Sequence, residues 1–151
     1  MHKTGLLVLI GLLLTLTPMT RASVTESRSI TIKIGSPMII DGRSANANSA
    51  PFISNQRAYA QLLPLTRAMN IPRQKVFWDA DNRAVVVTTE GNDLVFTVGD
   101  RDEETSLGTV VMDVAPLDIN GHVAVPVRYA AQALGYSVEW SAKDRVVSII
   151  K

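Results

Sequence analysis

The sequence predicts an α+β fold of antiparallel meander sheets with one helix in each half of the chain. Short segments alternate apolar and polar residues, as at 30–34, which is typical of half-buried strands. Two segments with helical spacing are bounded by proline and by glycine or asparagine. The same order of segments occurs twice, which predicts an internal duplication. Helices and antiparallel hairpins combined in this way indicate the α+β class.

The N-terminal segment, residues 1–22, is interpreted as a secretory signal peptide. His2 and Lys3 give a positive start, residues 5–16 are apolar, and Ala22 is the expected cleavage position. An apolar run of this length is short for a membrane span, which needs roughly 20 residues. An uncleaved N-terminal anchor is the alternative. We therefore expect residues 23–151 to be secreted or held at the cell surface, with no membrane span.

Charge and cysteine content exclude several classes of protein. Cleavage removes Lys3 and Arg21 from the 15 basic residues, which leaves 13 against 14 acidic residues. A net charge this close to neutrality gives no support for a basic surface that binds nucleic acid, so no nucleic-acid partner is expected. The cysteine count is 0, so the chain has no disulfide, no thiolate nucleophile and no cysteine metal site.

The internal repeat comprises residues 28–89 and 92–151. Identical residues fall in the same order in both segments, and the only two tryptophans occupy the same place in each. The matched pairs are Ala50 and Ala115, Pro51 and Pro116, Asn55 and Asn120, Ala68 and Ala133, Trp78 and Trp140, Ala80 and Ala142, Arg83 and Arg145, and Val85 and Val147. Upstream, residues 30–35 and 94–99 both alternate and both end in glycine.

Each repeat is expected to hold one helix followed by a hairpin. Residues 126–134 form the clearer helix, with Pro126 at its first position and Gly135 as its C-terminal stop. The other helix is expected at 61–69, where Asn70 takes the place of the glycine. Strands are expected at 30–34, 37–40, 75–78, 83–89, 94–98, 109–114, 137–140 and 145–150. One compact domain is favoured because a single repeat would bury a marginal core, while one sheet or two lobes both remain open.

Residues 57–89 and 119–151 carry a recognisable pattern. It contains a proline before an asparagine turn, a valine-proline-x-arginine step, a helix that ends in leucine-glycine, and a valine-x-tryptophan before a hairpin. The second copy keeps Pro116, Asn120, Gly121, Val125, Pro126, Arg128, Leu134, Gly135, Val138 and Trp140. The first copy keeps Pro51, Asn55, Arg57, Tyr59, Val76, Trp78 and Asp79, and departs at Gln61, Leu63 and Asn70.

This pattern resembles the copper amine oxidase N-terminal-like domain, and the resemblance covers nearly all of residues 28–151. In the oxidases that region is a stalk that stands apart from the catalytic core. The resemblance therefore implies an architecture, in two tandem diverged copies of the motif. It does not imply copper binding or amine oxidation.

The residues themselves argue against an enzyme. A copper amine oxidase needs three histidine ligands, but only His122 remains after the signal is removed. None of the three tyrosines follows an asparagine, as the quinone cofactor of that family would require. No Gly-x-Ser-x-Gly elbow presents a serine nucleophile. We therefore expect no catalytic, cofactor-binding or metal-ligating residues and no cofactor, and we expect His122 to be a solvated turn residue.

Two acidic segments could be mistaken for ion sites. Asp79, Asp81 and Asn82 are spaced like the start of a calcium loop, but the loop glycine and the distal glutamate are missing. A hairpin turn is the favoured interpretation. The run at 100–104 has the sequence DRDEE, so its acidic residues lie closer together. A solvated loop is favoured there, and a weakly bound divalent ion is the alternative.

The residues of this chain that match the pattern are assigned structural roles. Trp78 and Trp140 are expected to pack in the core of each repeat, with a sugar-stacking platform as the alternative. Arg128, near a helix start, would face the positive end of the helix dipole, so an acidic partner is expected, with Glu139 as the candidate. The structural set is Pro51, Asn55, Trp78, Pro116, Asn120, Gly121, Pro126, Arg128, Gly135 and Trp140.

These observations predict a secreted, non-catalytic structural or interaction module of the cell envelope or extracellular space. Its partner would be an envelope protein or a cell-wall glycan. The alternative is a carbohydrate- or peptidoglycan-binding module that uses exposed aromatic residues. Burial of the two tryptophans separates these hypotheses, because only exposed rings can stack on a sugar.

Overall fold

The computed structural model describes residues 28–151, so the expected signal peptide and its cleavage position lie outside the described residues. Two helices and several antiparallel sheets make up the fold, and the predicted α+β class is confirmed. Neither helix in the described part of the chain has the length and apolar character needed to cross a membrane. The helices are α1 (Leu62–Ala68) and α2 (Val127–Ala133).

A four-stranded sheet in the order β11-β12-β5-β4 forms the centre of the fold. Its two hairpins turn at Asn55-Gln56 and at Asn120-Gly121, where all four residues have positive φ angles of 48° to 83°. Two consecutive left-handed residues make the tight turn that matches the twist of antiparallel strands. The sequence predicted the asparagine turn but not these strands. They are β4 (Phe52–Ser54), β5 (Arg57–Gln61), β11 (Leu117–Ile119) and β12 (His122–Pro126).

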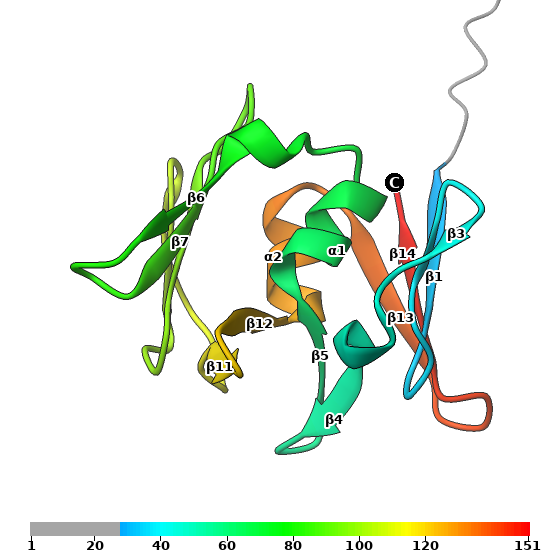
Figure 1. Ribbon diagram of the computed structural model, residues 1–151. Helices are drawn as coiled ribbons and strands as arrows, with labels where there is room; N and C mark the ends of the chain where they lie inside the picture. Colours follow the sequence, from blue (N-terminus) through cyan, green and yellow to red (C-terminus); the bar gives the residue numbers. More distant parts are fainter. Residues whose placement is uncertain (1–27) are drawn as a thin grey trace, which may run out of the picture.

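Two further sheets flank the helices. In Figure 1, α1 and α2 lie between a green-to-yellow sheet that contains β6 and β7 and a blue-and-red sheet that contains β1, β13 and β14. The first sheet has the order β10-β9-β8-β7-β6 and comprises β6 (Val76–Asp79), β7 (Ala84–Val87), β8 (Leu94–Thr97), β9 (Asp102–Thr105) and β10 (Gly108–Val111). The second has the order β1-β14-β13 and comprises β1 (Ser29–Lys33), β13 (Ser137–Ser141) and β14 (Val146–Ile150).

Short elements connect β1 to the central sheet. A two-stranded ribbon pairs β2 (Ile39–Ile40) with β3 (Arg43–Ser44), and a single 3-10 turn at Ala47–Ser49 follows it. A second 3-10 turn, at Arg73–Lys75, connects α1 to β6. The strand expected at 37–40 is therefore only two residues long. The strand expected at 109–114 ends earlier, at Val111.

Both helices end at the predicted stops. Asn70 and Gly135 have φ angles of 59° and 82°, the left-handed conformation that closes a helix. The amide of Tyr136 then donates to the carbonyl of Ala131 at 3.0 Å. Helix α2 begins after Pro126, one residue later than expected, and α1 is also slightly shorter than the predicted range.

The core lies where the helices meet the three sheets. Tyr59 is fully buried at its centre, stacks on Phe52 with 5.4 Å between ring centroids, and donates its hydroxyl to the carbonyl of Ala115 at 2.8 Å. Val127, Ala130 and Ala131 form the buried stripe of α2, as predicted from their spacing. The other large, fully buried side chains include Ile32, Leu65, Leu94, Phe96, Met112, Ile149, Val87 and Val125.

The two halves of the chain share strands. β1 from the first half pairs with β14 at the end of the second half, and β8 from the second half pairs with β7 of the first. Matching hydrogen bonds fix both junctions: Ile34 donates its amide to the Arg145 carbonyl at 3.0 Å, and Val98 donates to the Arg83 carbonyl at 2.9 Å. In the central sheet, Ala60 lies opposite Val125. The first half therefore supplies the edge strand β1 to the sheet that holds β13 and β14, and the second half supplies the interior strand β8 to the sheet that holds β6 and β7.

Candidate binding grooves

The two tryptophans are not core residues. Trp78 is 52% exposed and Trp140 is 44% exposed, so the prediction of core packing is wrong for both. Each ring does project from the inner face of its sheet, because Trp78 lies opposite buried Val85 and Trp140 opposite buried Val147. However, β6 and β13 are edge strands, and no further strand of the described residues pairs with their outer sides. The two rings are exposed because they lie on edge strands. The alternation of apolar and polar residues in the sequence does not show which strand lies at an edge.

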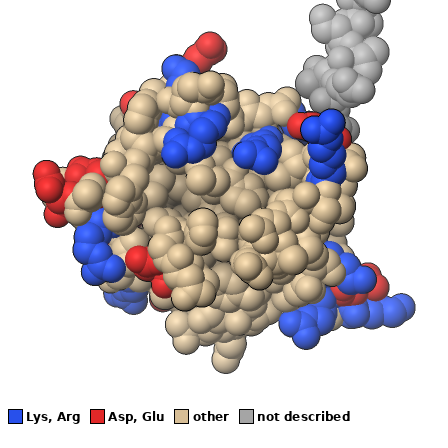
Figure 2. Space-filling view, in the orientation of Figure 1, with Lys and Arg blue, Asp and Glu red and all other residues tan. Residues whose placement is uncertain are grey.

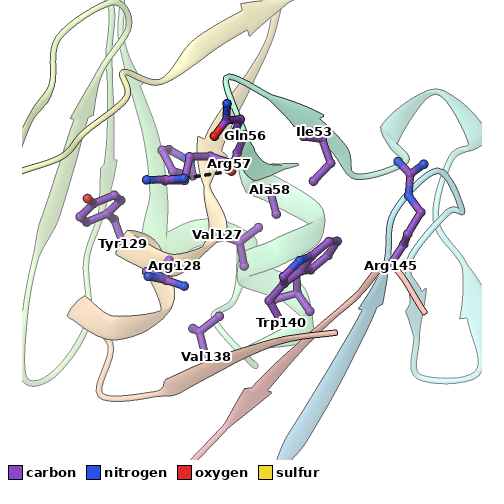
Figure 3. A pocket seen from close by; sticks show the side chains of 12 residues that line it. Ile53, Gln56, Arg57, Ala58, Val127, Arg128, Tyr129, Val138, Trp140 and Arg145 are labelled. Atoms are coloured by element: carbon purple, nitrogen blue, oxygen red, sulfur yellow. Dashed lines mark hydrogen bonds between the residues drawn. The ribbon is translucent and has the colours of Figure 1, made fainter. Parts of the chain in front are cut away.

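Trp140 lines a groove of about 470 Å³, which we call the arginine groove. This volume falls within the range of about 300–1,000 Å³ that is typical of small-ligand sites. Figure 3 shows Trp140 in the middle of the groove, with Arg128 on one side and Arg145 on the other. The lining residues are Ile53, Gln56, Arg57, Ala58, Pro126, Val127, Arg128, Tyr129, Val138, Trp140, Arg145 and Val147.

Different elements hold the polar groups of the arginine groove. Arg128 lies in the first turn of α2, directly after the buried residues Pro126 and Val127. Arg145 precedes β14 and has a left-handed φ of 53°, and its carbonyl is fixed by the amide of Ile34. The groove lining contains three arginines and no acidic residue. The site therefore has a positive potential around an aromatic surface.

The predicted pairing of Arg128 with Glu139 is wrong. Within residues 28–151 the single ion pair shorter than 4.0 Å joins Arg57 to Asp113. Glu139 lies between Val138 and Trp140 on β13, and successive side chains of a strand point to opposite faces. Because Val138 and Trp140 both face the groove, Glu139 points away from it.

Arg57 is the one groove arginine with an acidic partner. Its Nε donates to Oδ2 of Asp113 at 2.7 Å, and its Nη2 contacts the same oxygen. The Arg57 guanidinium lowers the pKa of the Asp113 carboxyl below its ordinary value. The Asp113 amide also donates to the hydroxyl of Tyr129 at 3.2 Å. This exposed network closes one end of the groove and orients Tyr129.

A second, smaller groove surrounds Trp78. Its volume is about 200 Å³, below the usual range for ligand sites, and we call it the leucine groove. Leu63 stands here at the position that aligns with Arg128, and His122 aligns with Arg57. Arg73 lines it too, but its Nη1 donates to the Val76 carbonyl at 2.7 Å. The other lining residues are Gln61, Leu62, Val76, Phe77, Trp78, Val85, Gly121 and Val123.

The remaining residues of the predicted structural set hold the backbone. Pro51 and Pro116 are buried, and their carbonyls accept the amides of Gly35 and Gly99 at 2.8 and 3.0 Å. Both glycines have a φ of 81°, which a residue with a side chain rarely adopts. Asn55, Asn120 and Gly121 form the hairpin turns, and Gly135 ends α2. The members of the set that line the arginine groove or the leucine groove are Trp78, Trp140, Pro126, Arg128 and Gly121.

The turn at 79–82 is a hairpin turn, as predicted. The Asp79 carboxylate accepts hydrogen bonds from the amides of Asp81 and Asn82 at 3.1 and 3.2 Å and from the Asn82 side chain at 2.7 Å. The hydrogen bonds from Asn82 lower the pKa of Asp79. The Asp79 carboxylate therefore accepts its hydrogen bonds from residues of its own turn and stabilises that turn.

The acidic run at 100–104 is not a solvated loop. Its last part enters β9, where Glu103 lies opposite buried Phe96 and is only 1% exposed. The Glu103 Oε1 atom has no hydrogen-bond partner among residues 28–151, and burial raises the pKa of this carboxyl to about 7. Glu104 points to the opposite face, is exposed and accepts a hydrogen bond from Thr109. The sequence did not predict this strand, because the consecutive charged residues masked the alternation of buried and exposed positions.

The side chains that could act as metal ligands do not cluster over the described residues. Within residues 28–151, no group of three or more histidine, aspartate or glutamate side chains is close enough to hold a metal ion. His122 is exposed at the start of β12, as expected for a turn-flanking residue. Figure 2 shows a face whose middle is largely uncharged, with Lys, Arg, Asp and Glu at its margins. This face therefore carries no continuous basic patch.

The fold and the grooves define a small α+β domain of antiparallel sheets with two open surface grooves. Residues 39–149 match the family model of the copper amine oxidase N-terminal domain, so the chain belongs to that family. The predicted resemblance is thereby confirmed at the level of the family, whose domain is a non-catalytic accessory part. No curated protein and no solved structure matches the chain.

Proposed function

We propose that the chain is a secreted, non-catalytic interaction module that binds a glycan of the cell envelope or extracellular space in the arginine groove. Membership of its family supports a non-catalytic, accessory role, and the sequence pattern of residues 1–22 supports secretion. Its partner is a polysaccharide chain, which places the function with the carbohydrate-binding alternative rather than with a purely structural role.

The exposure of Trp140 carries this proposal. A purely structural tryptophan would be buried, but 44% of this side chain is accessible. The indole is flat, amphipathic and large, so an exposed ring can cover the C–H face of a sugar while its edges stay hydrated. Buried Val127 and Val147 line the same groove, and Val147 lies opposite Trp140 on the neighbouring strand, so the ring stands beside the packed core.

The two grooves also support an origin by internal duplication. The segments that line them align residue by residue: Ala58 with Val123, Val127 with Leu62, and Val138 with Val76. Two diverged copies of one motif would produce such a pair of sites. Divergence at Arg128 and Leu63 would then have given the two grooves different ligands or left one unused.

Tryptophan fluorescence tests the proposed function. Trp78→Phe leaves Trp140 as the only indole, and Trp140→Phe leaves Trp78 as the matched control. Residues 23–151 of each variant are titrated with solubilised peptidoglycan strands, oligogalacturonate and cellohexaose. At least one glycan should change the emission of the Trp78→Phe variant and leave Trp140→Phe unchanged. Unchanged spectra of both variants with every glycan would refute the proposal.

Secretion has its own test. Expression of the full chain in a secreting bacterial host, followed by mass spectrometry of the released product, should give a chain that begins at Ser23. A product that retains residues 1–22 and stays in the membrane fraction would instead support the anchor alternative.

A further inference from the structure

We propose that the arginine groove selects a polysaccharide whose sugars carry carboxylate groups, a uronate polymer. This inference rests on the proposed function, because it names the class of glycan that the same groove binds. Arg128 and Arg145 carry the inference together with Trp140, and the leucine groove supplies the internal comparison.

Among the three arginines that line the arginine groove, Arg128 and Arg145 are the two that make no contact with an acidic partner within residues 28–151. Neither side chain makes a hydrogen bond or ion pair to another residue within the described part of the chain, whereas Arg57 is held by Asp113. Both are exposed, and both line the groove beside Trp140. No acidic residue lines the groove to neutralise them. An anionic ligand would therefore meet two unpaired guanidinium groups.

The shape of these groups favours a carboxylated sugar. A guanidinium presents a planar fork of N–H donors that fits the two oxygens of a carboxylate. A uronate joins a carboxylate to a ring with an apolar C–H face. In Figure 3 the Trp140 ring lies between the two arginines, so a stacked sugar would have its substituents directed toward them. A neutral sugar would stack on the indole but would offer no carboxylate to either guanidinium group.

The leucine groove lacks this combination. Leu63 occupies the position that aligns with Arg128, and Arg83, which aligns with Arg145, does not line the groove. Its one arginine, Arg73, already donates to a backbone carbonyl. Trp78 therefore has an exposed indole without two free guanidinium groups beside it. Selectivity for carboxylates is expected at Trp140 and not at Trp78.

Titration calorimetry with matched oligosaccharides tests the proposal. The probes are an oligomer of galacturonic acid and the same oligomer with its carboxyl groups methyl-esterified, which removes the charge and retains the sugar rings. The chain of residues 23–151 should bind the acid form at least about tenfold more tightly than the ester, and added salt should weaken only the acid form. Equal affinity for both forms would overturn the carboxylate inference and leave the proposed glycan function standing. Binding to no glycan at all would refute both.

Two variants locate the site. Arg128→Leu installs the residue that already stands at the aligned position of the leucine groove, and Arg145→Ala removes the second cation; both side chains are exposed. Each should weaken binding of the acid oligomer about tenfold or more and leave the circular dichroism spectrum unchanged. Arg73→Ala is the matched control and should bind as the parent does. Unchanged affinity in both groove variants would overturn the proposal.

Other anionic polymers distinguish the sugar from its charge. Polyphosphate and polyglutamate carry negative charge without a sugar ring. Both should bind at least about tenfold more weakly than the acid oligomer, and Trp140→Ala should abolish the difference. Polyglutamate or polyphosphate binding as tightly as the oligomer, with the same dependence on Arg128 and Arg145, would overturn the assignment to a uronate.

Discussion

Glu103 makes the stability of the domain depend on pH, and Glu103→Gln should remove that dependence. The side chain is 1% exposed on the inner face of β9, and in the described part of the chain its Oε1 atom finds no hydrogen-bond partner. Burial without a partner disfavours the charged form, which raises the carboxyl pKa from 4.5 to about 7. Glutamine has nearly the same shape and remains neutral at every pH.

The direction of the pH dependence follows from which state, folded or unfolded, holds the Glu103 proton more tightly. Between pH 4.5 and about 7 the folded protein keeps a proton on Glu103 that the unfolded chain releases. The unfolding free energy therefore falls as the pH rises through this window, and the contribution is fully present only below about pH 4.5. Each unit between the two pKa values is worth about 1.4 kcal/mol, so the loss approaches about 3 kcal/mol above pH 7.

Urea denaturation at several pH values between 4.5 and 8 measures this effect. Near pH 4.5 Glu103→Gln and the parent should have similar unfolding free energies, and at pH 8 the variant should be more stable by about 3 kcal/mol. Glu104→Gln is the matched control, because its side chain is exposed on the other face of the same strand. A constant difference between Glu103→Gln and the parent across this range would refute the reasoning.

Three further substitutions test the fold. Tyr59→Phe removes the buried hydroxyl that donates to Ala115 and should lower the unfolding free energy by about 1–2 kcal/mol in urea; no change would show that this hydrogen bond contributes nothing. Gly135→Ala forces a side chain into a φ of 82° with open space around it, so a cost of about 1 kcal/mol from backbone strain is expected in a thermal melt. Trp140→Ala should cost less than the roughly 3–5 kcal/mol of a fully buried tryptophan, because 44% of its surface is already accessible; a larger loss in urea denaturation would restore a core role.

The sequence predicted the helices and the class of the fold because their signals are local. Proline before α2, glycine after it and the apolar stripe between them depend on neighbours within a few residues. The hairpins that pair β6 with β7 and β13 with β14 join neighbouring segments, and they were predicted as well. The pairing of β1 with β14 was not accessible in this way, because it joins residues far apart in sequence, such as Ser29 and Ile150, and periodicity contains no record of the partner.

The incorrect predictions for the tryptophans and for the acidic run both arose from missing information about strand order. Trp140 recurs once per repeat and faces inward, which favours a core position, but only the order of the strands shows that β13 is an edge. Glu103 sits among charged residues, which favours a solvated loop, but β8 and β10 enclose it on both sides. The arginine groove could be found only from the structure, because α2, β5 and β13 contribute its walls.

The nuclear magnetic resonance signals of the two indole N–H groups test the central claim most directly. The chain contains 2 tryptophans, so a ¹⁵N-labelled sample of residues 23–151 gives one signal from each, and Trp78→Phe assigns them. On addition of the galacturonate oligomer, the Trp140 signal should shift in a saturable way while the Trp78 signal stays in place. A saturable shift confined to Trp78, or no shift of either signal, would contradict the account of Trp140 as the centre of the binding groove.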